Sequence, residues 1–588
     1  MTTTSRFNPN EHTPLLQEEF PNFIPIESRI SEDDSDETDT SIDLDSTTIN
    51  EILGWCLYGW AAEPFIISAI ATYIPLLLEQ FARDNGVLFD DHLVPCVSSN
   101  DPNDEIPNPN LPPNNVNNLA FNIFKAKQCV VKVLGFYVDT SSFTMYTFAF
   151  SVFVQTLLVI SITGFADRGN YKKPVLVISG FLGAISTILM YFLNYKFLLL
   201  SAFYCVLSNS CFGVVNVCGN SILPVLVSNS YKIRKLNKKL VQSSELSLND
   251  QIKIEGKLTI QKGLISSKIS GLGSGLGYFA AFIVQLISIL IVLKTGSSTL
   301  SIQYALLFIG CWWFIFQFPI IFLLKSREID PDLIPLTNNN RKITFFEYIQ
   351  IGWLNLLTAF KKIKLLKDVC IFLTGWFIIS DSITTINSAA ILFSKTELSM
   401  TTPELAIIGV IAIIAAIFGT LIIPNFVQPY FKLNSKMTLI LIIIWSSMIP
   451  FYGILGFYFD NIGLQHKSEM YLLAMWYGIS LGGLSTISRS LFSLLIPRGR
   501  ESLFFALFAV TDKGSSIIGP IISGLITDKT HNIRYCFWFL WILLVISLPV
   551  FWLLNLERGK RDASEFEDEE LLHEELADGA FRVTHYQQ

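Results

Sequence analysis

The chain has 588 residues, of which 51% are hydrophobic and only 15% are charged, and its mean hydropathy is +0.47. Water-soluble domains carry about 25% charged residues, so this composition excludes a water-soluble protein and indicates a membrane protein. The net charge of −7 is unevenly distributed, because acidic, polar tails at 1–50 and 557–588 flank a long apolar region.

No sequence pattern of an enzyme site is present. The chain contains no G-x-S-x-G or H-E-x-x-H motif, and its six histidines fall in tails or in loops between apolar segments. The glycine-rich run Gly271–Gly277 lacks the Lys-Ser/Thr pair that a phosphate-binding loop requires. We therefore expect neither an enzyme nor a resident metal or cofactor, and no nucleic-acid partner.

Twelve apolar segments are each long enough, at about 20 residues, to cross a bilayer as a helix. In chain order they are 52–80, 142–163, 174–193, 197–227, 266–293, 301–324, 369–394, 404–426, 437–458, 469–494, 502–527 and 535–555. The connection 325–368 divides them six and six, which predicts two six-helix bundles at 51–324 and 369–556. The expected fold class is an all-α polytopic membrane protein.

Lysine and arginine are unequally distributed over the connections. If both tails are cytoplasmic, the segments on that side, including the basic loop 228–265, hold 28 of these residues and the opposite side holds 10. Cytoplasmic loops retain positive charge, so the asymmetry supports an even number of spans with both termini in the cytoplasm.

The N-terminal tail contains a short sorting pattern. Glu11, Leu15 and Leu16 fit the acidic dileucine pattern that adaptor complexes read on cargo destined for the vacuole. Short patterns also arise by chance, so coincidence is the alternative. The acidic stretch that follows predicts a disordered tail.

The loop 81–141, on the non-cytoplasmic side, is rich in Asn, Pro and Asp, which predicts irregular structure. It contains Cys96 and Cys129 on the side where a disulfide can persist. A bridge between them would stabilise the loop by about 3–4 kcal/mol on the chain-entropy model. Two free thiols are the alternative.

The connection after the second span reads GFADRGNYKK and resembles the signature loop of the major facilitator superfamily in a shorter variant. An Asp at a helix end beside basic residues can bind a neighbouring helix terminus and hold one conformer of a transport cycle. Asp167, Arg168, Lys172 and Lys173 are therefore gating candidates. The alternative is an ordinary basic cytoplasmic loop.

Two further segments carry a narrower resemblance. Gly54–Val87 resembles the opening span of the fungal autophagy-related vacuolar amino-acid effluxers, and Ser488–Pro520 is similar to that family's tenth-to-eleventh-span region. The resemblance covers most of 50–556 and implies a vacuolar exporter of amino acids released by autophagic protein breakdown. Bacterial relatives usually have Tyr-Asp-Trp-Ala-Asn-Ser here, whereas this chain has Gly59 and Glu63 at the Asp and Ser positions, so bacterial assignments do not transfer.

Ionisable and polar residues inside apolar segments are candidates for the transport pathway. A charge near mid-membrane costs about 2.5–3.5 kcal/mol, and Glu63 in span one and Asp381 in span seven are the clearest cases. Pro64 predicts a kink beside Glu63. The further candidates are Tyr58, Asn216, Asn220 and Asn387. Hydrogen bonding between helices is the alternative role for all of these.

The eleventh span contains an adjacent pair of opposite charges. Asp512 and Lys513 are neighbours in sequence, so on a helix they should point in different directions rather than pair. Arg489, at the end of span ten, is a candidate partner for Asp512. We expect a gating or structural role for these three residues.

The combined pattern predicts a secondary transporter that exports amino acids, such as leucine, isoleucine and tyrosine, from vacuole to cytosol. Its expected partners are membrane lipid, small amino acids and a sorting adaptor. A transporter of another small solute is one alternative, and a non-transporting receptor or scaffold of the same fold is another. Charge at mid-membrane favours transport, because a scaffold does not need it.

Overall fold

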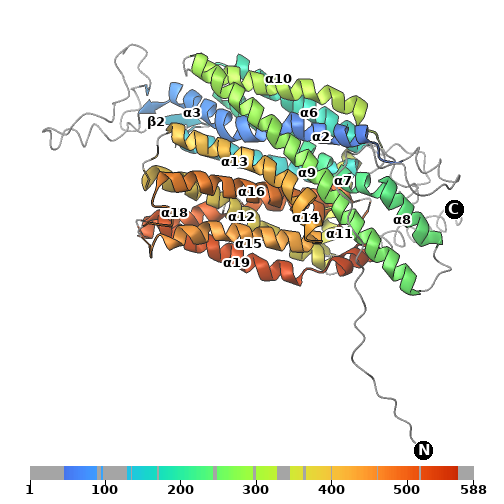
Figure 1. The fold of residues 1–588 in the computed structure, drawn as a ribbon. Coiled ribbons are helices and arrows are strands. Elements are labelled where there is room, and N and C mark those ends of the chain that lie inside the picture. Colours follow the sequence, from blue (N-terminus) through green and yellow to red (C-terminus); the bar gives the residue numbers. More distant parts are fainter. Residues whose placement is uncertain are drawn as a thin grey trace, which may run out of the picture. The chain divides into compact units, whose positions relative to one another are not determined.

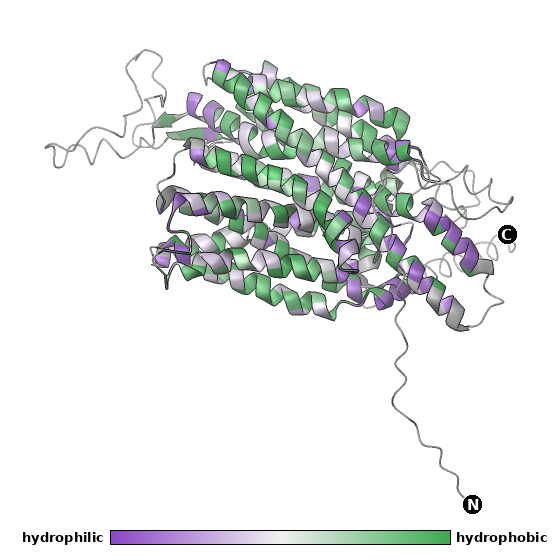
Figure 2. Ribbon diagram, in the orientation of Figure 1, coloured by the Kyte–Doolittle hydropathy of each residue, from purple (hydrophilic) through white to green (hydrophobic). Residues whose placement is uncertain are grey.

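The chain is helical through most of the residues that the computed structural model describes. These residues are 46–88, 95–96, 129–133, 135–167, 171–242, 248–295, 299–326, 345–361, 366–398, 400, 402–459, 461–498, 500–515, 518–530 and 532–566. Figure 1 shows the helices running side by side, and Figure 2 shows that apolar residues dominate most of them, whereas hydrophilic residues gather in the helix α8 (Tyr231–Gln242).

The first span changes helix type at a proline. The helix α2 (Ile49–Pro64) continues as a π-helical segment, η1 (Phe65–Tyr73), and then as α3 (Ile74–Asp84). Proline has no backbone N–H and disrupts the regular hydrogen-bond ladder, and π-helical turns of this kind are frequent at functional sites. The expected irregularity beside Glu63 is therefore a π-helical segment that begins immediately after Pro64.

The rest of the N-terminal half consists of long helices. They are α5 (Thr140–Ala166), α6 (Lys172–Leu189), α7 (Leu198–Ser228), α8 (Tyr231–Gln242), α9 (Leu248–Lys294) and α10 (Thr299–Leu323). Short 3-10 turns, η2 (Met190–Phe192) and η3 (Tyr195–Phe197), join α6 to α7. We call 46–326 the N-terminal half.

The helix α11 (Phe345–Lys361) precedes the C-terminal half, 366–566. The helices of this half are α12 (Lys367–Thr396), α13 (Thr402–Ile422), η6 (Ile423–Val427), α14 (Gln428–Tyr430), α15 (Ser435–Leu455), α16 (Lys467–Phe492), α17 (Glu501–Ser515), α18 (Ile518–Thr530), η7 (Ile533–Tyr535) and α19 (Cys536–Leu553). A final helix covers 556–566.

Eleven helices in the described part of the chain are long and apolar enough to cross a membrane. The predicted span 502–527 is not among them: residues 516 and 517 lie outside the described residues, and the described helices on either side, α17 and α18, have 15 and 13 residues. Large apolar side chains such as Phe192, Phe322 and Leu553 are at least 68% exposed, as expected for a surface that lipid covers.

The glycine-rich run in α9 packs against both halves. An added Cβ at Gly273 or Gly277 would lie 2.5 Å from the Trp55 ring or 2.7 Å from Glu63 Cγ, both on α2. An added Cβ at Gly271 or Gly275 would instead meet Thr420 on α13, at 2.5 and 3.0 Å. The Gly273/Gly277 spacing therefore allows close approach of α2 in the N-terminal half, and the Gly271/Gly275 spacing allows close approach of α13 in the C-terminal half.

A small sheet stands where the sequence predicts irregular structure. Its strands β1 (Val87–Leu88), β2 (Cys129–Val133) and β3 (Phe136–Asp139) are antiparallel in that order, with Leu88 opposite Cys129. Cys96 is joined to Cys129 by a disulfide. We call the end of the helical bundle that carries this sheet the disulfide end.

Candidate functional site: a closed helix contact and central charges

At one end of the bundle, Asp167 binds the first turn of α17. Its carboxylate accepts hydrogen bonds from the backbone N–H groups of Ser502 and Leu503, at 2.8 and 2.9 Å. These groups lack partners within a helix, and a helix N-terminus attracts negative charge. The contact joins the two halves, and we call this end of the bundle the Asp167 end.

A lysine completes the same contact. Lys172 Nζ lies 2.6 Å from Glu501 Oε2 and 3.7 Å from Asp167 Oδ1, and all three side chains are at most 11% exposed. Burial raises the pKa of the Asp167 carboxyl above its usual range, while the nearby Lys172 charge opposes that shift. The arrangement keeps the two halves together at the Asp167 end.

Of the other gating candidates in this loop, Arg168 lies outside the described residues. Lys173 is partly buried in the first turn of α6, and no hydrogen bond or ion pair among the described residues links it to α17. The structure therefore brings Asp167 and Lys172 together and adds Glu501 and Ser502, which the sequence analysis did not single out.

Deeper in the protein, polar side chains of α2 and α7 form a chain of hydrogen bonds. The Tyr58 hydroxyl donates to Asn220 Oδ1 at 2.8 Å, and Asn220 Nδ2 donates to Asn216 Oδ1 at 2.9 Å. Trp55 Nε1 donates to the Gly219 carbonyl at 2.7 Å. Three candidates of the transport pathway, Tyr58, Asn216 and Asn220, are thus joined in one network that fixes α2 against α7.

Glu63 faces positive charges from the other half. It is partly exposed, and it interacts electrostatically with Arg489 of α16 and Lys513 of α17. No described residue donates a hydrogen bond to its carboxylate, and no ion pair within 4.0 Å joins it to either cation among the described residues. Opposite charges from the two halves therefore converge here without neutralising each other directly.

Arg489 contacts the N-terminal half. Its Nη1 donates to the Tyr58 hydroxyl at 3.5 Å and to Ser274 Oγ at 3.4 Å. Asp512, its expected partner, accepts at Oδ1 from Trp376 Nε1 at 3.1 Å and from Ser380 Oγ at 2.8 Å. Asp512 Oδ1 therefore binds residues of α12, whereas the described contacts of Arg489 lie on α2 and α9.

The expectation that Asp512 and Lys513 do not pair is wrong, because their charged atoms lie 4.0 Å apart. Neighbouring side chains on a helix diverge at Cβ, but a long lysine side chain can fold back toward the adjacent carboxylate. Both side chains are about one third exposed, so the pair contributes at most about 1 kcal/mol.

The two candidates of span seven lie on α12. Asp381 is 5% exposed and its Oδ1 accepts a hydrogen bond from Gly519 N, at the start of α18, at 2.8 Å. Asn387 is exposed on the same helix. The described contacts of Asp381 therefore lie inside the C-terminal half.

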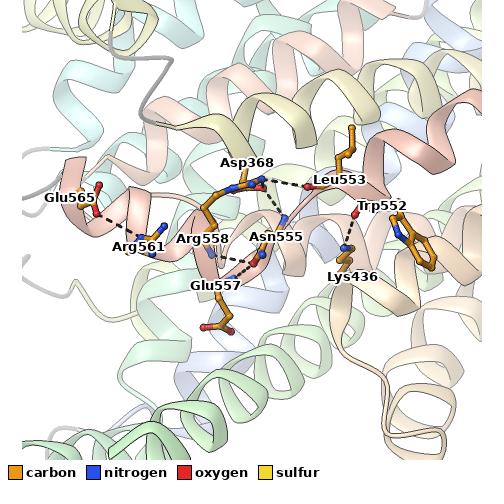
Figure 3. A network of polar contacts seen from close by, with 9 residues as sticks. All are labelled: Asp368, Lys436, Trp552, Leu553, Asn555, Glu557, Arg558, Arg561 and Glu565. Atoms are coloured by element: carbon orange, nitrogen blue, oxygen red, sulfur yellow. Dashed lines mark hydrogen bonds and ion pairs between the residues drawn. The ribbon is translucent and has the colours of Figure 1, made fainter. Parts of the chain in front are cut away.

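A second polar network joins the first turn of α12 to the segment that follows α19 (Figure 3). The Arg558 guanidinium binds the fully buried Asp368 carboxylate through two hydrogen bonds, of 2.6 and 2.8 Å, and Asn555 N donates to Asp368 at 2.8 Å. The hydrogen bond with Asp368 raises the pKa of Arg558, so this side chain stays charged. The sequence analysis named neither Asp368 nor Arg558 as a site residue. An acidic residue at the start of one span and a basic residue just after the last span are the sequence features that could have indicated this pair.

The sorting candidates Glu11, Leu15 and Leu16 lie outside the described residues.

Within the described part of the chain, no group of three or more His, Cys, Asp or Glu could hold a metal ion.

Comparison with known proteins identifies the family. Residues 47–564 match the family described as "Vacuole effluxer Atg22 like". Autophagy-related protein 22 of Vanderwaltozyma polyspora is 47% identical over 545 residues, which cover 91% of this chain and 96% of the relative. The relatives of the same name from Pichia angusta and Saccharomyces cerevisiae are 46% and 44% identical, covering 89% and 88% of this chain and 95% and 93% of their own lengths.

Solved structures support the fold. The human organic anion transporter MFSD10 superposes with a TM-score of 0.53 at 11% identity, covering 85% of this chain and 98% of its own. The proton:xylose symporter XylE, a major facilitator superfamily protein, gives 0.50 at 13% identity, covering 88% and 96%. The chain is therefore a polytopic membrane transporter with the major facilitator fold, and it belongs to the vacuole effluxer Atg22-like family.

Proposed function

We propose that this transporter moves neutral amino acids, such as leucine, isoleucine and tyrosine, from the vacuole lumen to the cytosol. The observation that carries the proposal is the convergence of Glu63 with Arg489 and Lys513 between the two halves. A neutral amino acid carries one positive and one negative charge, so it complements a site that offers both signs. Membership in a vacuole effluxer family supports the location.

The Asp167 end faces the cytosol in this proposal, because the excess of Lys and Arg lies on the segments of that side. The contact of Asp167 and Lys172 with α17 then closes the cytosolic side. Export requires that these bonds break after the substrate binds from the lumen, so that the two halves separate at the Asp167 end.

Delivery to the vacuole is assigned to the N-terminal tail. We place both termini in the cytosol, where an adaptor can read Glu11, Leu15 and Leu16. Replacing both leucines with alanine should divert the protein to another membrane, and unchanged localisation by microscopy would remove this part of the proposal.

The function is tested with sealed vacuolar vesicles that either contain or lack the protein and are loaded with labelled leucine, tyrosine or arginine. We expect faster release of leucine and tyrosine when the protein is present, and no such difference for arginine. Equal release of all three amino acids with and without the protein, at confirmed expression and vacuolar location, would refute the proposed substrate class.

A further inference from the structure

The central charges suggest how a substrate is oriented. Glu63 lies on α2 immediately before Pro64 and the π-helical segment, and its carboxylate receives no hydrogen bond from any described residue. A carboxylate inside a membrane domain is unfavourable unless a partner compensates it. Since Arg489 and Lys513 are electrostatic neighbours without a direct ion pair, the partner position beside Glu63 is open among the described residues.

Arg489 has unused hydrogen-bonding capacity as well. Only Nη1 donates, over 3.4–3.5 Å, while Nε and Nη2 have no hydrogen bond to a described residue. A guanidinium presents N–H groups in a planar fork that matches a carboxylate. Lys513 differs, because it lies 4.0 Å from Asp512 in its own half. Arg489 is therefore the better receptor for a substrate carboxylate.

The spacing of the two charges fits a molecule that carries both. Arg489 contacts Ser274, and Glu63 packs on Gly277, three residues further along α9. Three residues correspond to about 4.5 Å along a helix axis. Glu63 and Arg489 are thus neighbours that do not touch, and a small zwitterion with its two charged groups on one carbon atom can bind both.

We propose that Arg489 binds the α-carboxylate and Glu63 the α-ammonium of the transported amino acid. This assignment rests on the proposed function and names the two residues that recognise the invariant part of the substrate. It places one recognition residue in each half, so a bound substrate draws α2 and α16 toward each other. Substrates that lack either charged group should not compete.

The test is counterflow of labelled leucine into proteoliposomes containing the full chain. For the wild type, we expect inhibition by excess leucine but not by leucinamide, which lacks the carboxylate, or by 4-methylpentanoate, which lacks the amine. Arg489→Gln and Glu63→Gln should each lower counterflow at least tenfold. Lys467→Gln is the matched control for charge loss, because Lys467 is on the same helix as Arg489, 44% exposed at its side chain and paired with Glu404.

The outcomes separate the two proposals. Absence of leucine, isoleucine and tyrosine counterflow in the folded wild type would refute the proposed function. Leucine counterflow that both analogues inhibit as well as leucine does would leave that function standing and overturn the orientation. The same holds if Arg489→Gln transports at the wild-type rate. The analogue competition uses wild-type protein, so it decides the question even if a variant does not fold.

A different set of contacts concerns the helix 556–566, which we call the C-terminal helix. Arg558 anchors it to Asp368 of α12, and Lys560 Nζ donates to Thr259 Oγ1 of α9 at 2.7 Å. Phe566 is 1% exposed and lies edge-on to Phe504 of α17, with ring centroids 6.5 Å apart. The C-terminal helix therefore contacts the N-terminal half through Lys560, in addition to α12 and α17 of its own half. On α17 it packs on Phe504, the residue that follows Leu503.

From these contacts we infer that the C-terminal helix stabilises the closed contact at the Asp167 end. Separation of the halves at this end would break the Lys560–Thr259 hydrogen bond or move the helix away from Phe504. The free energy of these contacts is therefore added to that of the Asp167 network, and the helix opposes opening of the gate.

This inference is tested by the rate at which a maleimide added from the Asp167 end labels Cys218, a buried thiol beside the Asp167 contact. Arg558→Gln should raise the rate about tenfold. Lys560→Gln, which removes the hydrogen bond across the halves and a 3.9 Å ion pair with Glu557 within the helix, should raise it less. Arg561→Gln is the control, because Arg561 is on the same helix and 69% exposed. Wild-type rates in both test variants would overturn the inference.

Discussion

Replacing Asp167 with asparagine should open the gate at the Asp167 end. The aspartate accepts hydrogen bonds from two backbone N–H groups at the start of α17 and is 2% exposed at its side chain. Asparagine has nearly the same shape, but its NH2 group cannot accept a hydrogen bond from an N–H donor. The variant therefore loses one charge-assisted hydrogen bond and the favourable interaction of a carboxylate with the helix N-terminus.

The magnitude follows from the kind of bond that is lost. A hydrogen bond to a charged group contributes about 1.5–3 kcal/mol, and every 1.4 kcal/mol changes an equilibrium about tenfold. The ratio of open to closed conformers should therefore rise roughly 10- to 150-fold. Lys172 retains Glu501 at 2.6 Å, so its charge stays paired and no larger effect is expected.

Native Cys218 reports on this equilibrium. It is 1% exposed and lies beside Ser502, Thr163 and Ala166 at the contact between the halves. A membrane-impermeant maleimide applied from the Asp167 end should label it in proportion to the open fraction. Peptide mass spectrometry separates this label from those on the other free cysteines.

The matched control is Glu79→Gln, which removes a carboxylate at an exposed pair with Arg83 near the disulfide end. This variant should label Cys218 at the wild-type rate. If folded Asp167→Asn also labelled at the wild-type rate, the Asp167 contact would not limit opening, and the argument from the α17 terminus would be refuted.

Three further predictions concern other parts of the structure. Gly277→Leu should displace Glu63 and reduce leucine counterflow at least tenfold, whereas Gly256→Leu, which meets open space on the same helix, should not alter it. Lys172→Glu should abolish transport in the same assay, and adding Glu501→Lys should restore part of it, because the buried ion pair is re-formed with reversed charges. Cys129→Ser should destabilise the sheet at the disulfide end by about 3–4 kcal/mol, seen as faster trypsin cleavage nearby.

The helical fold was predictable because hydropathy and loop length are local properties of a sequence. Eleven of the twelve predicted spans correspond to single long helical spans, and the exception lies at 502–527. In that region α17 and α18 lie on either side of residues 516 and 517, which are outside the described residues. The Asp381 carboxylate accepts a hydrogen bond from Gly519 N in the first described turn of α18, and the two residues are 138 positions apart in the sequence. Hydropathy cannot reveal such a tertiary contact.

The candidate site was predictable only where a motif is contiguous. Asp167 and Lys172 stand out in one short loop, but their partners Glu501 and Ser502 are more than 320 residues away. Similarly, Arg489 is visible as a charge in an apolar segment, whereas its contacts with Tyr58 and Ser274 depend on how the two halves meet. Sequence therefore indicates which charges need partners, and tertiary structure decides which partners they have.

The helix α17 connects the gate with the central charges. Its first residue, Glu501, binds Lys172, and Lys513, twelve residues later, interacts electrostatically with Glu63. Twelve residues of α-helix extend about 18 Å, so one rigid element reaches from the Asp167 contact to the proposed substrate site. A bound substrate changes the charge around Glu63 and so changes the electrostatic force on Lys513. Any resulting shift of α17 moves the backbone N–H groups that Asp167 binds. Because both sites bear on the same helix, substrate occupancy and opening of the gate should be energetically coupled.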